Sequence, residues 1–233
     1  MGSAILPYRS NPMRVPMKHI DGTSLSGRCL WAALASLCFL EITPPALAGS
    51  TVGCDAYLRG DYAAAMREFG PLAAQGDISA QIAVGWLYDN GLGIPHDDAQ
   101  AVKWYRQAAE QGDARAEQYL ATMYAAGTGV PKDLIDAEKW FRLAAEQGSS
   151  GGQYGLGVMY RDGVVVVQDS MEAYKWFSLA SRSGAGTPEG AQAVAAQSAL
   201  AASMTAEQIG KADELVKTWK PSRPLKLAGM CER

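Results

Sequence analysis

Residues 80–112 read AQIAVGWLYDNGLGIPHDDAQAVKWYRQAAEQG, and this pattern recurs without a gap in blocks of 36 residues that begin at Ala80, Ala116 and Gly152. The residues that return at fixed offsets are Tyr88, Tyr124 and Tyr160; Gly91, Gly127 and Gly163; Asp97, Asp133 and Asp169; and Trp104, Trp140 and Trp176. Self-similarity at this period is typical of solenoids of helical hairpins, in which each unit buries its apolar face only against its neighbours. The sequence therefore predicts an all-α superhelical solenoid. Its extended surface favours recognition of another macromolecule over catalysis in a pocket.

Each block predicts two helices joined by a short loop. We expect the first helices at about residues 78–90, 114–126 and 150–162, and the residues that can cap them are Asp77, Asp113 and Ser149. Glycines at the loop entry and after the second helix should end these helices. The second helix of the first block carries Ala101, Trp104, Tyr105 and Ala108 at the spacing of one buried face. This spacing predicts that the recurring Trp–aromatic pairs belong to the core and do not form an exposed ladder for carbohydrate stacking.

The chain divides by pattern into a leader, the repeats and two caps. We expect a signal peptide at 1–48, an N-terminal capping half-repeat at 49–79, repeats at 80–115, 116–151 and 152–187, C-terminal capping helices at 188–220 and a tail at 221–233. Within the last part, Thr205 and Gln208 have the spacing of a capping box. The third repeat carries four glycines in its first helix, and Val165 and Val167 stand where the other loops have glycine and proline. We therefore expect the hairpin of this repeat to open first.

The leader predicts export. Arg28 precedes an apolar stretch at 29–40, which is too short for a membrane span, and a small-x-small motif ends at Ala48. We expect cleavage after Ala48 and a periplasmic or secreted protein. Without residues 1–48, 17 basic and 22 acidic residues remain, a net charge of −5 with no basic run. This balance argues against a nucleic-acid partner.

Two cysteines remain after this cleavage, Cys54 and Cys231, near opposite ends of the chain. In an oxidising compartment they can pair with each other, link two chains into a dimer, or stay free. A bridge within the chain requires the tail to run back along the solenoid at a cost in entropy, so we expect it less than the other states together. A lipid anchor at Cys54 is a further alternative, because Val52-Gly53-Cys54 faintly resembles a lipobox.

Residues 80–112 and 116–148 closely resemble the Sel-1-like repeat family, short-hairpin relatives of tetratricopeptide repeats, and 152–184 resembles it with Val165 and Val167 as departures. The resemblance implies a right-handed α/α superhelix. It also implies adaptor or scaffold roles in the bacterial envelope, including control of signalling and exopolysaccharide secretion. Some cysteine-rich members are hydrolases of the β-lactamase type, but their repeats each hold a cysteine pair and no repeat here contains cysteine. We therefore expect no enzymatic activity, no catalytic residue, no cofactor and no metal.

The resemblance also implies that the first helices line the concave face, where residues that vary between blocks are available to a protein partner. These residues recur at i, i+4 and i+7 and thus share one stripe of each helix. They are Ile82, Trp86 and Asp89; Gln118, Thr122 and Ala125; and Tyr154, Val158 and Arg161. The alternative for Trp86 is that it packs against a neighbouring hairpin. We predict that this stripe is the partner-binding site of a monomer or disulfide-linked dimer.

Overall fold

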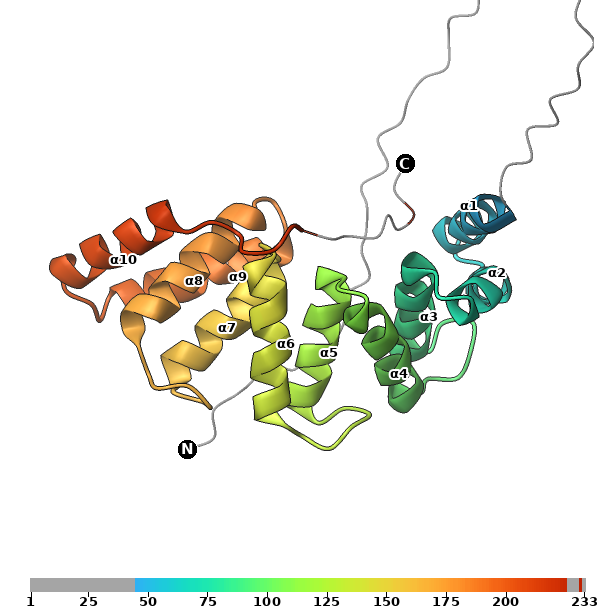
Figure 1. The fold of residues 1–233 in the computed structure, drawn as a ribbon, viewed down its shortest axis with the longest axis horizontal. Helices are drawn as coiled ribbons and strands as arrows, with labels where there is room; N and C mark the ends of the chain where they lie inside the picture. The colour runs from blue at the N-terminus through green and yellow to red at the C-terminus, as the bar shows by residue number, and fades with distance from the viewer. Residues whose placement is uncertain (1–44, 226–230, 232–233) are drawn as a thin grey trace, which may run out of the picture.

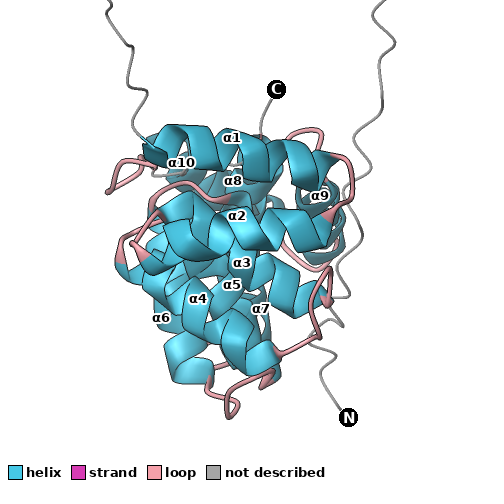
Figure 2. Ribbon diagram, turned by 90° about the vertical axis from the view of Figure 1, so that its right-hand side faces the viewer, coloured by secondary structure: helices cyan, strands magenta, loops and turns pink. Residues whose placement is uncertain are grey.

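The computed structural model describes residues 45–225 and 231, with side chains from residue 51 onward. In this part of the chain there are ten helices and no strand. Their bounds are α1 (Pro45–Leu58), α2 (Tyr62–Ala74), α3 (Ile78–Asn90), α4 (Asp98–Glu110), α5 (Ala114–Ala126), α6 (Leu134–Glu146), α7 (Ser150–Asp162), α8 (Ser170–Ser183), α9 (Pro188–Ala201) and α10 (Ala206–Thr218). Successive helices follow one another along an arc (Figure 1), and the view from its end shows them stacked in layers (Figure 2). The predicted all-α solenoid is confirmed.

The expected capping residues set the ends of the repeat helices. The carboxylate of Asp77 accepts a hydrogen bond from the Ala80 backbone N–H at 2.8 Å, and Asp113 and Ser149 cap α5 and α7 in the same way. Gly91, Gly127 and Gly163 end the three helices with φ of 62°, 76° and 66°. Only glycine adopts this left-handed conformation without steric cost, so the loop can leave each helix at once.

Helix α8 ends in a different backbone conformation from α4 and α6. Gly112 and Gly148 are left-handed, with φ of 88° and 92°, whereas Gly184 has φ of −98°. The carbonyl oxygen of Gly184 accepts hydrogen bonds from the backbone N–H and the hydroxyl of Thr187, which itself caps α9. The chain therefore turns directly into the C-terminal helices at the point where the sequence repeat fades.

The Trp–aromatic pairs pack in the core, as expected. Tyr105 and Phe177 are fully buried, and Trp176 is buried with them. Trp104 and Trp140 are half-buried. The ammonium groups of Lys103, Lys139 and Lys175 lie over the adjacent Trp rings, at 5.6, 5.5 and 4.4 Å from their centroids. These distances are within the range of cation–π interactions, so the same contact recurs in all three repeats.

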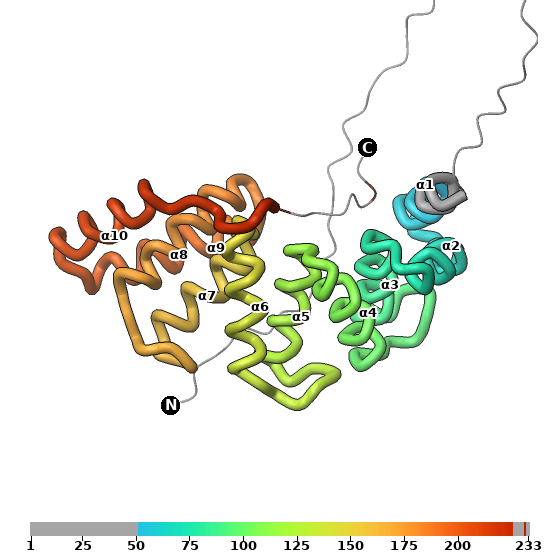
Figure 3. The backbone as a smooth tube through the Cα atoms, viewed as in Figure 1, coloured from blue at the N-terminus to red at the C-terminus, as the bar shows by residue number. Residues whose placement is uncertain are grey.

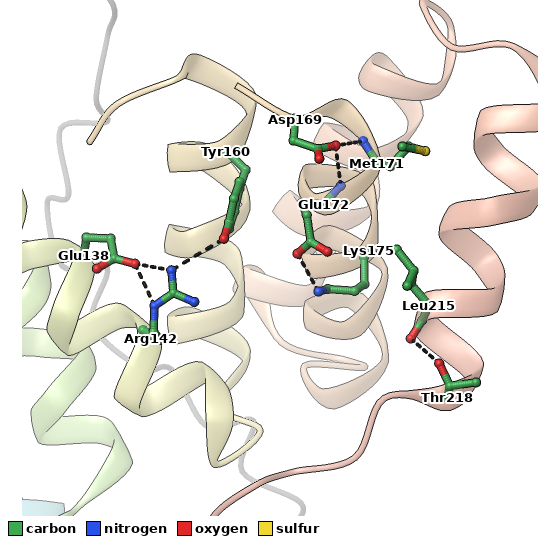
Figure 4. A network of polar contacts seen from close by, with 9 residues as sticks. All are labelled: Glu138, Arg142, Tyr160, Asp169, Met171, Glu172, Lys175, Leu215 and Thr218. Carbon is green, nitrogen blue, oxygen red and sulfur yellow. Dashed lines mark hydrogen bonds and ion pairs between the residues drawn. The ribbon is translucent and has the colours of Figure 1, made fainter. Parts of the chain in front are cut away.

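An arginine joins each of two second helices to the first helix of the next hairpin. Arg142 on α6 pairs with Glu138 one turn earlier and donates to the hydroxyl of Tyr160 on α7 at 3.5 Å (Figure 4). One repeat earlier, Arg106 donates to the hydroxyl of Tyr124. These bonds recur 36 residues apart, so the same contact fixes how adjacent hairpins stack.

A second recurring contact runs along the edge of the solenoid. The amide of Gln111 donates to the side-chain oxygen of Gln81 at 2.8 Å, and the amide of Gln147 donates to Glu117 at 2.8 Å. The Glu117 side chain is only 1% exposed, and its other carboxylate oxygen pairs with Arg223 at 3.2 Å. The segment after α10 therefore lies against this edge, far in sequence from the helix that it contacts.

The segment after α10, which we call the C-terminal strap (219–225 and 231), returns along the molecule (Figure 3). The Trp219 ring packs edge-on against Trp176 of α8, and the Ser222 backbone N–H donates to the Glu146 carbonyl at 3.1 Å. At the end of the strap, Cys231 forms a disulfide with Cys54 of α1. The expectation that free thiols or a disulfide-linked dimer outweigh a bridge within the chain was wrong. Contacts with three successive parts of the solenoid order the strap, which reduces the entropy that the bridge itself must overcome.

The disulfide also bears on the N-terminal predictions. It uses the sulfur of Cys54 that a lipid anchor would need, which argues against the lipid-anchored alternative. Residues 1–44, with most of the expected signal peptide, lie outside the described residues. The expected cut after Ala48 falls within α1 and leaves Cys54 on the mature side. Among the described residues, no helix combines the length and apolar character that crossing a bilayer requires.

Candidate interaction groove

A hollow of about 400 Å³ lies over α5 and α7, between α3 on one side and α9 on the other. We call it the α5–α7 groove. Helix α5 contacts α7, and α7 contacts α9, so first helices of successive hairpins meet on this face. Most of the predicted partner-binding stripe lines the groove: Asp89, Gln118, Thr122, Ala125, Tyr154, Val158 and Arg161. The structure therefore brings together residues that the sequence places in three separate blocks.

Two members of the predicted stripe lie elsewhere. Ile82 is fully buried in the core cluster that contains Ala101 and Leu120, so it cannot contact a partner, and its assignment to the binding site is corrected. Trp86 is half-buried, with its ring centroid 5.4 Å from that of Tyr57 and 6.4 Å from that of Tyr62. These tyrosines belong to α1 and α2, so Trp86 packs against a neighbouring hairpin, the alternative that the sequence left open.

Glycines of α7 bring the floor of the groove close to the helix backbone. A Cβ on Gly151 would lie 2.0 Å from the side chain of Gln118, and one on Gly155 would lie 2.5 Å from the ring of Phe141. The hydroxyl of Ser149 donates to the amide oxygen of Gln118 at 3.1 Å. The glycine-rich sequence of α7 thus lets α5 and α6 side chains lie against its backbone and form a floor without intervening side chains.

The sequence reasoning missed several lining residues. Tyr119 and Met123 follow Gln118 and Thr122 directly on α5, and a wider stripe would have included both. Tyr119 stands where the other blocks have Ala83 and Gly155, a variation in size that could have indicated a special position. Glu189 and Gln192 come from α9, outside the repeats, and the repeat pattern contains no signal for them.

The groove has an apolar floor and an acidic rim. Asp89 accepts a hydrogen bond from the hydroxyl of Tyr105 at 3.4 Å. Burial raises the pKa of Asp89, and the charge of Asp98 raises it further. Arg161 binds Asp162 through two hydrogen bonds of 2.7 and 3.0 Å. The only basic residue in the lining is therefore already paired.

Clustered acidic side chains, histidine and cysteine are the residues that most often hold metals or act as nucleophiles. No group of three or more His, Cys, Asp or Glu side chains in this part of the chain has a geometry that could hold a metal ion. His96 lies on an exposed loop, 3.1 Å from Asp98, and the two described cysteines form the disulfide. What the groove offers instead is concave apolar area with charged groups at its edge, which suits binding.

Comparison with known proteins agrees with this description. The Sel1 repeat family matches residues 78–113, 114–149 and 150–184. The chain is a Sel1 repeat protein. A Sel1 repeat protein from Oxalobacter formigenes is 33% identical, with a TM-score of 0.58, over 64% of this chain and 57% of its own. A protective antigen of uropathogenic Escherichia coli with an SLR fold is 35% identical, with a TM-score of 0.57, over 66% of this chain and 38% of its own.

Among curated proteins, none matches the chain. The chain also spans less than two thirds of the length of the two solved relatives. The Sel1 repeats account for the hairpins from α3 to α8, and they carry most of the groove. Helix α9 follows the last matched residue, so the Glu189 side of the groove belongs to a part of this chain outside the repeats.

Proposed function

We propose that this Sel1 repeat protein is a non-catalytic scaffold of the bacterial envelope that binds a segment of a protein partner in the α5–α7 groove. One observation carries the proposal: seven variable stripe residues from three repeats line a single hollow of about 400 Å³. Apart from Ile82 and Trp86, which pack inside the molecule, the residues that vary within this otherwise strict repeat lie on the same hollow. Their convergence in one concavity supports a binding role.

The proposed location is the periplasm or the exterior, with a mature chain that begins at Gly49. The intramolecular disulfide supports this location, because disulfides form and persist in oxidising compartments. A role in envelope signalling or exopolysaccharide secretion follows from the resemblance to the family and is part of the proposal. Hydrolase activity of the β-lactamase type gains no support from a chain whose repeats contain no cysteine.

Site-specific photo-crosslinking in cells tests the groove. A photoreactive amino acid at Thr122, in the groove, should give a discrete crosslinked partner in the envelope fraction. The same amino acid at Val194, an exposed valine of α9 outside the groove lining, should not. Val158→Asp should abolish the Thr122 crosslink because it places a charge on the apolar floor, and Val194→Asp is the matched control. Crosslinks from Val194 and none from Thr122 would place the partner elsewhere and refute the proposal.

A further inference from the structure

We infer that the α5–α7 groove takes a peptide segment of the partner that presents a bulky apolar side chain close to a lysine or arginine. The inference rests on the proposed function and specifies the chemistry of the occupant. It follows from the groove's shape, its apolar floor and the unequal distribution of charge around its rim.

The floor of the groove accepts a bulky apolar group. Met123, Phe141, Val158 and Met159 line it, from α5, α6 and α7. A volume of about 400 Å³ is at the low end of the range of roughly 300–1,000 Å³ for ligand pockets. This is room for one or two large side chains and not for a folded domain. Methionine side chains adapt their shape to an inserted ring or aliphatic chain, so the floor does not demand one particular residue.

The charges in the groove lining favour a positively charged group on the ligand. The acidic lining residues are Asp89 of α3, Asp162 of α7 and Glu189 of α9, and Arg161 already pairs with Asp162. Across residues 51–225 and 231, no ion pair joins Asp89 or Glu189 to a lysine or arginine. Two carboxylates of the lining, one on α3 and one on α9, are therefore available to a basic side chain of the occupant.

Both carboxylates act on the same part of the groove. Burial raises the pKa of Tyr119, and the negative charges of Glu189 and Asp89 each raise it further, whereas Arg115 lowers it. The ring of Tyr119 lies 5.0 Å from that of Tyr105, which hydrogen-bonds Asp89. The aromatic wall thus lies in the field of both acids. An apolar side chain on the floor would place a neighbouring lysine or arginine near them.

Partial burial of the Asp89 carboxylate strengthens its preference for a cationic ligand over an anionic one. Asp89 is half-buried, and burial raises its pKa, so water stabilises its carboxylate less than it would on an open surface. Interactions between charges are stronger where water is partly excluded, so an incoming cation gains more here than at an exposed acid. An acidic segment or an anionic polysaccharide would meet repulsion at the same place.

Selection from a random twelve-residue peptide phage library on the purified, oxidised protein tests the inference. We expect peptides that pair an aromatic or large aliphatic residue with lysine or arginine nearby. The double variant Asp89→Asn/Glu189→Gln should still select apolar residues but lose the enrichment of basic ones. Glu207→Gln, at an exposed acid on α10, serves as the control and should select the same peptides as wild type.

A synthetic peptide of the selected consensus makes the comparison quantitative by fluorescence polarisation. We expect the double variant to bind it about tenfold more weakly and with less dependence on salt, because charge complementarity at a partly desolvated site is lost. Val158→Asp should abolish binding, and Tyr154→Ala, which removes a ring without adding charge, should weaken it. Thermal melting of each variant checks that the fold persists.

The outcomes separate this inference from the proposed function. Apolar or acidic peptides that bind in the groove without a basic residue, and that Val158→Asp abolishes, would overturn the inference and leave the groove as a binding site. Selected peptides whose binding resists both Val158→Asp and Tyr154→Ala would bind elsewhere and would overturn both. Binding that both substitutions weaken, with a cation preference that the double variant removes, supports both.

Discussion

At the scale of single residues, Glu117 marks the point where a repeated polar contact differs between hairpins. Gln81 and Gln153 occupy the same repeat position and are neutral, whereas Glu117 introduces a carboxylate that is 1% exposed. It accepts hydrogen bonds from Gln147 and Arg223. Burial raises the pKa of Glu117 above its ordinary value, although Arg223 and Gln147 oppose this effect. The strap is therefore held by a charge whose burial is costly.

This balance predicts how stability depends on pH. A raised pKa means that folded Glu117 binds its proton more tightly than the unfolded chain does, so wild type gains stability as the pH falls through the folded pKa. The Glu117→Gln variant has no titratable group at this position, so it lacks this contribution to the pH dependence. We expect the free energy of unfolding of wild type, relative to this variant, to rise as the pH is lowered from neutral toward the ordinary pKa of a glutamate, as measured by urea denaturation. Glu207→Gln should show no such trend. A fall on acidification would mean that attraction to Arg223 outweighs burial.

At the scale of elements, the hairpin of the third repeat differs most from those of the other two repeats. Gly93 and Gly129 are left-handed, and a Cβ on either would lie 2.4 Å from the backbone at the start of the preceding hairpin's second helix. Val165 occupies the equivalent position with φ of 67° and is 51% exposed. The glycines of α7, by contrast, allow close packing, since a Cβ on Gly152 would lie 2.6 Å from Cβ of Ala144. The expected weakness of this hairpin is therefore better assigned to its loop than to its helix.

Replacing this valine tests that assignment. A left-handed conformation costs a non-glycine residue about 1–2 kcal/mol, part of which the flexibility of glycine offsets. We expect Val165→Gly to raise the free energy of unfolding by about 1 kcal/mol and to slow hydrogen exchange in α7. Val167→Gly, at an exposed valine of the same loop outside the left-handed region, should bring no gain. An equal gain from both substitutions would refute the assignment.

At the scale of the whole molecule, the strap and the disulfide join the two ends of the solenoid. The bridge links residues 177 positions apart, so the loop that it closes contains nearly every described helix. Such a link removes many conformations from the unfolded chain, an effect worth roughly 3–5 kcal/mol for long loops. In a solenoid each hairpin contacts mainly its neighbours, so the terminal hairpins unfold most easily. The disulfide should therefore stabilise the ends of the solenoid most.

Removing the disulfide should show how much it contributes to the free energy of unfolding. We expect Cys231→Ser to lower the free energy of unfolding by roughly 2–4 kcal/mol, with the loss of hydrogen-exchange protection greatest in α1 and α2. Cys54→Ser should match it, because each removes the same bond. The oxidised wild type should migrate as a monomer on a non-reducing gel and faster than its reduced form. A disulfide-linked dimer, or unchanged stability in both variants, would contradict the intramolecular bridge.

The sequence alone determined the helices, their caps and seven of the residues that line the groove. These features depend on interactions between residues close in sequence. A side chain caps the helix that it precedes, a glycine ends the helix, and the spacing of residues assigns them to one face. Only the tertiary structure decided that Ile82 is buried, that Glu189 of α9 completes the groove, and that Cys231 reaches Cys54. Each of these depends on how far successive hairpins rotate against one another. That rotation comes from the sum of many packing contacts, and no local pattern encodes it.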